Sequence, residues 1–192
     1  MIERYSRPEM ARVWDLENKY AKWLEVEILA CEAHAAKGRI PKDAAERIRK
    51  KARFDVKRID EIEQTVKHDV IAFLTSVADA IGDDSAYMHM GMTSSDVLDT
   101  GLALQIKDAS AIIRKDLERL ASILKTRAFE FKNTVQIGRS HGIHAEPTSF
   151  GLKLALWYEE VGRNIRRFDQ AVQSVSCGMI SGAVGNFAQI DP

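Results

Sequence analysis

The chain has 192 residues, enough for one domain or slightly more and for a sizeable core. Basic and acidic residues both number 28 and the formal net charge is +0, which gives no sign of a partner such as nucleic acid or an anionic membrane. Two distant cysteines, no apolar leader and no window of roughly 18 apolar residues predict a cytoplasmic protein without a disulfide framework, a signal peptide or a membrane span.

Apolar periodicity predicts helices almost throughout, because only 4 prolines and 11 glycines interrupt the chain. The first helix is expected to begin near Pro8, where Ser6 and Glu9 have the spacing of a capping box. Gly38 is its natural end. A short helix should follow over residues 44–52.

A further helix is expected over residues 59–81, with an apolar stripe at spacings of three and four. His68 lies about 200° around this helix from Val66 and from Val70, since each residue turns by about 100°. The pattern therefore directs His68 away from the core. There it is either a solvated surface residue or a functional one.

The segment YMHMGMTSSD (87–96) changes the pattern. Its methionines alternate with His89 and Gly91, which is typical of extended chain. Thr93 and Asp96 fit a capping-box variant and predict a long helix to about residue 132, in which Gly101 indicates close packing. The free N–H groups of such a helix start attract phosphate or carboxylate, although hydroxyls that only cap the helix explain the same residues.

The segment GRSHGIHAEP (138–147) should interrupt the helices, because Gly142 and Pro147 disfavour helical backbone. Another amphipathic helix is expected over about 148–174, followed by a glycine-containing loop or hairpin. Two long helices with apolar stripes need partners that cover them. A helical bundle or an oligomer is therefore predicted.

The histidines allow three kinds of chemistry. A metal site is disfavoured, because His141 and His144 are not on a helix and only Glu146 is near enough to complete a ligand set. Acid–base catalysis is possible for histidines, which titrate near neutrality. Anion binding is favoured at the start of the 95–132 helix. Cationic candidates for such a site are Arg4, Lys67 and Arg139.

Three blocks of the sequence together resemble the adenylosuccinate lyase family of the fumarase/aspartase superfamily. They are TVKHDVIAFL (65–74), YMHMGMTSSDVLDTGLALQ (87–105) and GRSHGIHAEPTSFG (138–151). The similarity runs in order from Arg4 and Tyr5 to the final SGAVGNFA. The middle block is shared widely across that superfamily, whereas the KHD and SHGIHAEP blocks are similar to the adenylosuccinate branch.

The resemblance implies an all-α fold of the fumarase/aspartase type. An N-terminal helical domain would occupy residues 1–111, and the first long helices of a central bundle would occupy residues 112–192. The chain would then be the N-terminal portion of a longer protein. It also implies a homotetramer whose sites are shared between subunits.

The reaction implied by the resemblance is elimination of fumarate in purine biosynthesis, from adenylosuccinate to give AMP and from SAICAR to give AICAR. The family needs no metal or organic cofactor for it. By resemblance, His141 is the general acid and His68 the second histidine of the catalytic site. Implied contacts to this small-molecule substrate are Arg4, Tyr5, Lys67, Asp69, His89, Thr93, Ser94 and Ser140, the last standing where the family more often has threonine.

One part of the family's site has no counterpart here. The base is a serine in a loop with the signature SS-x-MP-x-K-x-NP, and this signature is missing from the 192 residues. The chain is therefore expected to carry the acid side of the site and to be inactive alone. Two alternatives stay open: argininosuccinate lyase or another superfamily lyase, and a non-catalytic fragment whose long helices only oligomerise.

Overall fold

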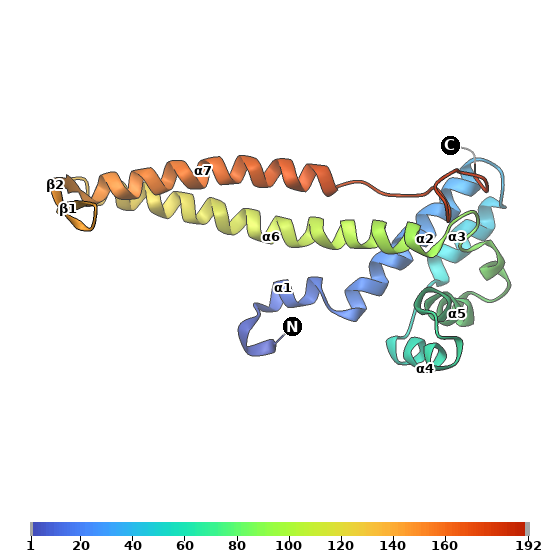
Figure 1. Ribbon diagram of the computed structural model, residues 1–192. Coiled ribbons are helices and arrows are strands. Elements are labelled where there is room, and N and C mark those ends of the chain that lie inside the picture. Colours follow the sequence, from blue (N-terminus) through green and yellow to red (C-terminus); the bar gives the residue numbers. More distant parts are fainter. Residues whose placement is uncertain (1, 191–192) are drawn as a thin grey trace. The chain divides into compact units, whose positions relative to one another are not determined.

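The computed structural model describes residues 2–190, whose regular elements are helices apart from one small hairpin (Figure 1), so the all-α prediction is confirmed. The elements in chain order are η1 (Glu3–Tyr5), α1 (Pro8–Val13), α2 (Leu16–Ala36), α3 (Lys42–Lys51), α4 (Val56–Val66), α5 (Asp69–Ile81), η2 (Gly82–Tyr87), α6 (Ser94–Glu130), β1 (Val135–Ser140), β2 (Ile143–Ser149) and α7 (Phe150–Val175). None of the helices within this described range is long and apolar enough to cross a membrane.

The chain forms two compact units. The first contains the residues up to Asp108 together with those from Ser176 onward, and the second contains Ala109–Val175. Helix α6 contributes residues to both units. The predicted domain boundary between residues 111 and 112 stays a prediction.

The core of the first unit is built around aromatic side chains of α2 and α5. Trp23 and Phe73 are buried and meet edge to face, with ring centroids 5.6 Å apart. Tyr20 stacks on Phe73 at 5.8 Å. A Cβ at Gly101 of α6 would lie 2.7 Å from Cδ1 of Trp23, which confirms the close packing expected at this glycine.

The first predicted helix is in fact two helices, α1 and α2, and the second begins with Asp15 as its cap. The Asp15 carboxylate accepts a hydrogen bond from the Asn18 N–H at 2.7 Å. The capping box proposed for Ser6 and Glu9 is wrong. The Ser6 hydroxyl donates to a backbone carbonyl instead, and Glu9 pairs with an arginine. Pro8 does occupy the first turn of α1, as expected.

The helix predicted over residues 59–81 is also divided. Helix α4 ends at Val66, Lys67 adopts the left-handed conformation with φ 54°, and His68 is the N-cap of α5. The angular argument that placed His68 on a helix face therefore does not apply. His68 lies outside the core because the chain leaves the helix between α4 and α5.

The long helices predicted on either side of residues 138–147 are confirmed as α6 and α7. The segment between them is an antiparallel hairpin rather than an irregular break. Its two-residue turn is His141–Gly142, with φ angles of 52° and 76°, the signature of a type I′ turn. A bulge at Gly138 shifts the register, and a Cβ there would lie 2.7 Å from the Glu146 carbonyl oxygen.

Candidate functional site

Three predicted site residues share an uncommon backbone conformation. Among the residues that the structure describes, the non-glycine residues with positive φ are Lys67, His89, His141 and Phe187. The left-handed region costs an L-residue on the order of 1–2 kcal/mol, and such strain gathers at functional sites. Each of the three motif blocks therefore contains one left-handed residue, Lys67, His89 or His141, that the sequence had already indicated as a site residue.

His68 connects the N-termini of α5 and α6 through its two ring nitrogens. Nδ1 accepts a hydrogen bond from the Ile71 N–H at 3.3 Å, and Nε2 lies 3.4 Å from the Ser94 hydroxyl oxygen. A nitrogen that accepts carries no proton, so in this arrangement the proton is on Nε2 and is donated to Ser94. Asp69 Oδ1 lies 3.7 Å from the same Nδ1.

The start of α6 is organised by a buried carboxylate. Asp96 is fully buried, and its Oδ2 accepts the Thr93 N–H at 2.8 Å, which is one half of the predicted capping box. The same carboxylate accepts the N–H groups of Ser181 and Gly182 at 3.0 and 3.2 Å. Asp96 thus holds the later segment against the start of α6. It also takes up the Thr93 donor that the anion-site interpretation had left free.

His89 lies in a tight turn, so the extended conformation expected for residues 88–92 is wrong. Its backbone N–H donates to Glu27 Oε2 at 2.9 Å, and its ring Nδ1 lies 2.6 Å from Glu27 Oε1. Glu27 is fully buried, whereas 23% of the His89 side chain is exposed. Sequence reasoning missed Glu27, although its place four residues after the core residue Trp23 could have revealed a buried acid.

The remaining predicted contacts of the first unit are exposed. Arg4 and Tyr5 lie in η1, where the Arg4 guanidinium is 4.8 Å from the centre of the Tyr5 ring. Lys67 is exposed at the break between α4 and α5. These side chains are accessible to a ligand.

His141 and Ser140 belong to the second unit, where they sit at the hairpin tip. His141 is the first residue of the turn, and its side chain is exposed. Ser140 ends β1 and pairs in register with Ile143, next to the pair formed by Arg139 and His144. The hairpin joins the ends of α6 and α7 (Figure 1). A rigid two-residue turn therefore presents the imidazole.

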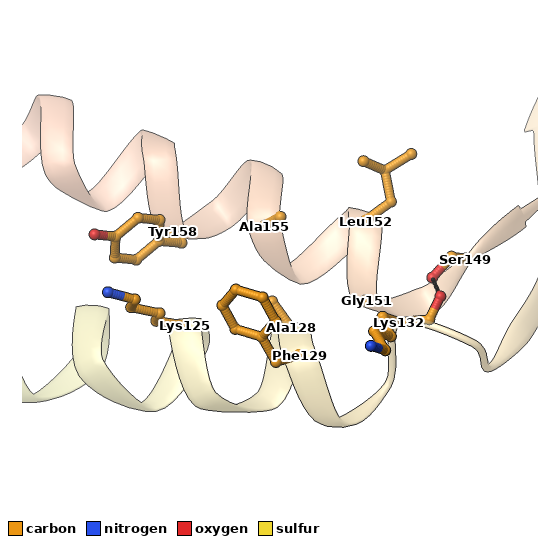
Figure 2. Close-up of a pocket in the computed structure, with 9 residues that line it drawn as sticks. All are labelled: Lys125, Ala128, Phe129, Lys132, Ser149, Gly151, Leu152, Ala155 and Tyr158. Atoms are coloured by element: carbon orange, nitrogen blue, oxygen red, sulfur yellow. Dashed lines mark hydrogen bonds between the residues drawn. The ribbon is translucent and has the colours of Figure 1, made fainter.

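A groove of about 550 Å³ also lies in the second unit, between α6 and α7. Figure 2 shows Lys125 and Phe129 on one side and Tyr158 and Ala155 on the other. Its lining residues include neither a histidine nor a carboxylate, and none is a predicted site residue. The groove is therefore not a candidate active site.

The metal interpretation gains no support from the described part of the chain. No group of three potential ligands among histidine, cysteine, aspartate and glutamate is placed there to hold an ion.

A family model described as "Lyase" matches residues 3–192. The chain belongs to this lyase family. Among its relatives are an adenylosuccinate lyase of Streptococcus mutans, with 57% identity, and one of Bacillus subtilis, with 55% identity. Both matches cover the whole chain but only 44% of the relative. The family resemblance carried by the sequence motifs is thus confirmed.

Solved structures of the lyase family share the fold. A fumarate lyase from Mesorhizobium sp. BNC1 is similar with a TM-score of 0.89 and 28% identity, over 94% of this chain and 43% of that one. The 3-carboxy-cis,cis-muconate lactonizing enzyme from Pseudomonas putida is similar with a TM-score of 0.85 and 27% identity, over 96% of this chain and 44% of that one.

Proposed function

We propose that this lyase chain is part of an adenylosuccinate lyase, which releases fumarate from adenylosuccinate to give AMP and from SAICAR to give AICAR. The observation that carries the proposal is the left-handed backbone at Lys67, His89 and His141, one in each motif block. Relatives with 57% and 55% identity bear that name, which supports the same choice of substrates.

The proposed step is an elimination. A base removes the proton from the carbon beside a carboxylate, and the C–N bond then breaks with its electron pair moving to the purine nitrogen. The His141 imidazolium donates its proton to that nitrogen, and fumarate departs. His68 orients the substrate through a ring that α5 and Ser94 already hold in place.

Substrate binding is assigned to polar side chains of η1 and of the three motif blocks. Arg4, Lys67 and His89 supply positive charge or N–H donors for phosphate and carboxylate, and Thr93, Ser94 and Ser140 supply hydroxyls. Tyr5 and Asp69 are assigned to the nucleotide. The serine base has no counterpart among the 192 residues, so the proposal gives this chain the acid side of the site only.

The two predicted domains are part of the same proposal, and so is assembly as a homotetramer with shared sites. The assembly is supported by the apolar surface of the second unit, where Phe129, Leu152 and Leu156 are 68%, 65% and 61% exposed. Contiguous apolar side chains of this kind mark contact surfaces between chains. The cytoplasmic location predicted from the cysteine content also stays a proposal.

The decisive experiment replaces His141 in the complete protein. His141→Asn keeps a residue that tolerates the left-handed region, so the turn should persist, but asparagine cannot donate an acidic proton. We expect kcat for adenylosuccinate to fall on the order of 10²–10⁴-fold, measured by the absorbance of fumarate, with an unchanged melting temperature. His144→Asn, on the next strand of the hairpin, is the matched control.

Two results would overturn the proposal. One is full turnover by His141→Asn, which would favour a fragment whose helices only oligomerise. The other is turnover of argininosuccinate in place of both succinylated purine substrates, which would favour another member of the superfamily. The isolated 192-residue chain should release no fumarate.

A further inference from the structure

Glu27 satisfies both hydrogen-bond donors of His89 with its two carboxylate oxygens. Oε2 accepts the His89 backbone N–H at 2.9 Å, and Oε1 accepts Nδ1–H at 2.6 Å. The carboxylate is fully buried, so solvent does not compete for these bonds. Because Nδ1 donates to Glu27, Nε2 is the ring nitrogen that remains for a ligand.

The same face of α2 holds the rest of the turn. Cys31, four residues after Glu27, donates its S–H to the Tyr87 carbonyl at 3.4 Å. His34, three residues further, lies with Nε2 2.9 Å from the Met90 carbonyl oxygen. Spacings of four and three put these side chains on one side of a helix. Helix α2 therefore fixes residues 87–90 at four atoms, including the strained His89.

We propose that Glu27 is a positioning residue, which orients His89 and keeps one ring proton on Nδ1, so that Nε2, when it also carries a proton, donates to an anionic group of the substrate. This inference rests on the proposed function, which assigns His89 to substrate binding. With both ring nitrogens protonated, His89 carries a positive charge that the Glu27 carboxylate, 2.6 Å from Nδ1, balances. The pair therefore suits a phosphate or carboxylate better than a neutral ligand.

Glutamine at position 27 would break this arrangement with almost no change in shape. A carboxylate offers two acceptors, whereas an amide offers one oxygen and one NH₂ group. His89 presents two donors, so one of them would face the NH₂ group. Either the ring loses its fixed tautomer or the backbone of the turn loses its anchor.

The test measures the kinetics of Glu27→Gln in the complete protein. We expect KM for adenylosuccinate to rise on the order of 10-fold to 100-fold, the effect of one lost charge-assisted hydrogen bond, while kcat changes only a few-fold. The control is Glu25→Gln on the same helix, where the carboxylate is 47% exposed. An unchanged KM in the folded Glu27→Gln variant would overturn the proposal.

A double-mutant cycle with His89→Gln separates positioning from general support of the fold. If Glu27 acts through His89, adding Glu27→Gln to His89→Gln should leave KM nearly unchanged. An additive effect would contradict the proposal. If Glu27→Gln does not fold, Glu27→Asp replaces it in the same measurements. Aspartate keeps the negative charge, but its side chain is shorter by one methylene and no longer reaches His89. The same rise in KM is expected, and again no further rise when it is combined with His89→Gln.

A spectroscopic readout keeps the two proposals distinguishable. In protein labelled with ¹⁵N-histidine, His89 should carry its proton on Nδ1, and Glu27→Gln should shift the ring toward the Nε2–H form. If the unmutated complete protein shows no lyase activity, the proposed function fails while this spectrum still decides the role of Glu27. A His89 ring that is unaffected by Glu27→Gln would overturn the positioning role.

Discussion

His68 combines a structural role with a proposed chemical one. Its Nδ1 replaces the side-chain oxygen that usually caps a helix, and its Nε2 reaches Ser94 at the start of the next long helix. The residue before it, Lys67, takes the left-handed conformation that commonly ends a helix. Loss of activity on substitution of His68 would therefore not by itself prove a role in catalysis.

Two substitutions at His68 should separate these roles. His68→Asn keeps a good N-cap, so the free energy of unfolding should stay within about 0.5 kcal/mol, whereas His68→Ala should lower it by about 1 kcal/mol. If His68 takes part in the reaction, both variants should lose turnover to a similar extent. The measurements are urea unfolding and fumarate release. Wild-type turnover in His68→Asn would show that His68 acts only as a cap.

The motif blocks predicted which residues matter but not what surrounds them. His89 follows from its block, yet its partner Glu27 lies 62 residues earlier, in a helix that reads as an ordinary apolar stripe. The burial of an acid depends on which distant segment covers it. Periodicity carries no information about that contact.

The hairpin between α6 and α7 is an element that the sequence did not predict. Its turn is His-Gly rather than the usual Asn-Gly signal, and β2 contains a proline. Pro147 is tolerated because it lies in a two-stranded sheet, where each strand is an edge. The long helices on both sides were predicted correctly, because their stripes extend over many turns.

Two glycines of α7 should respond in opposite ways to alanine. A Cβ at Gly151 would overlap backbone atoms of Ala128 and Lys132, which cannot swing aside, so Gly151→Ala should cost about 1–3 kcal/mol. Gly162 has open space around it, so Gly162→Ala should stabilise the helix by about 0.5–1 kcal/mol. Unfolding curves of the two variants test this. A melting temperature that rises for Gly151→Ala would contradict the packing described for the second unit.

At the scale of the whole molecule, the first unit consists of two stretches of the chain. The second stretch begins at Ser176, after the residues Ala109–Val175 that form the second unit. The segment from Ser176 onward is held by Asp96, and also by the Thr100 hydroxyl, which donates to the Met179 carbonyl at 3.2 Å and accepts the Met179 N–H at 2.9 Å. The sequence predicted a loop there but not its attachment. The bonds involve backbone groups, and these leave no residue pattern.

Asp96→Asn should loosen this attachment. The amide has one acceptor oxygen in place of two, so at least one of three part-buried N–H groups would lose its partner, at about 1 kcal/mol. Hydrogen exchange at Ser181 and Gly182, followed by mass spectrometry, should accelerate. Asp99→Asn, at an exposed position of the same helix, should leave it unchanged. Equal exchange in both variants would show that other contacts retain the segment.

At the three site residues with left-handed backbone, the substitution that would relieve the backbone would also remove the functional side chain. At Lys67, His89 and His141, glycine would relieve the backbone, because it enters that region without a steric cost. The same replacement would delete a cation or an imidazole. A variant library sorted only for heat resistance should therefore accumulate glycine at Lys67 and His141, whereas glycine at position 89 would leave the buried Glu27 carboxylate without its ring partner. On the proposed function, a library sorted for growth on purine-free medium should reject glycine at all three positions.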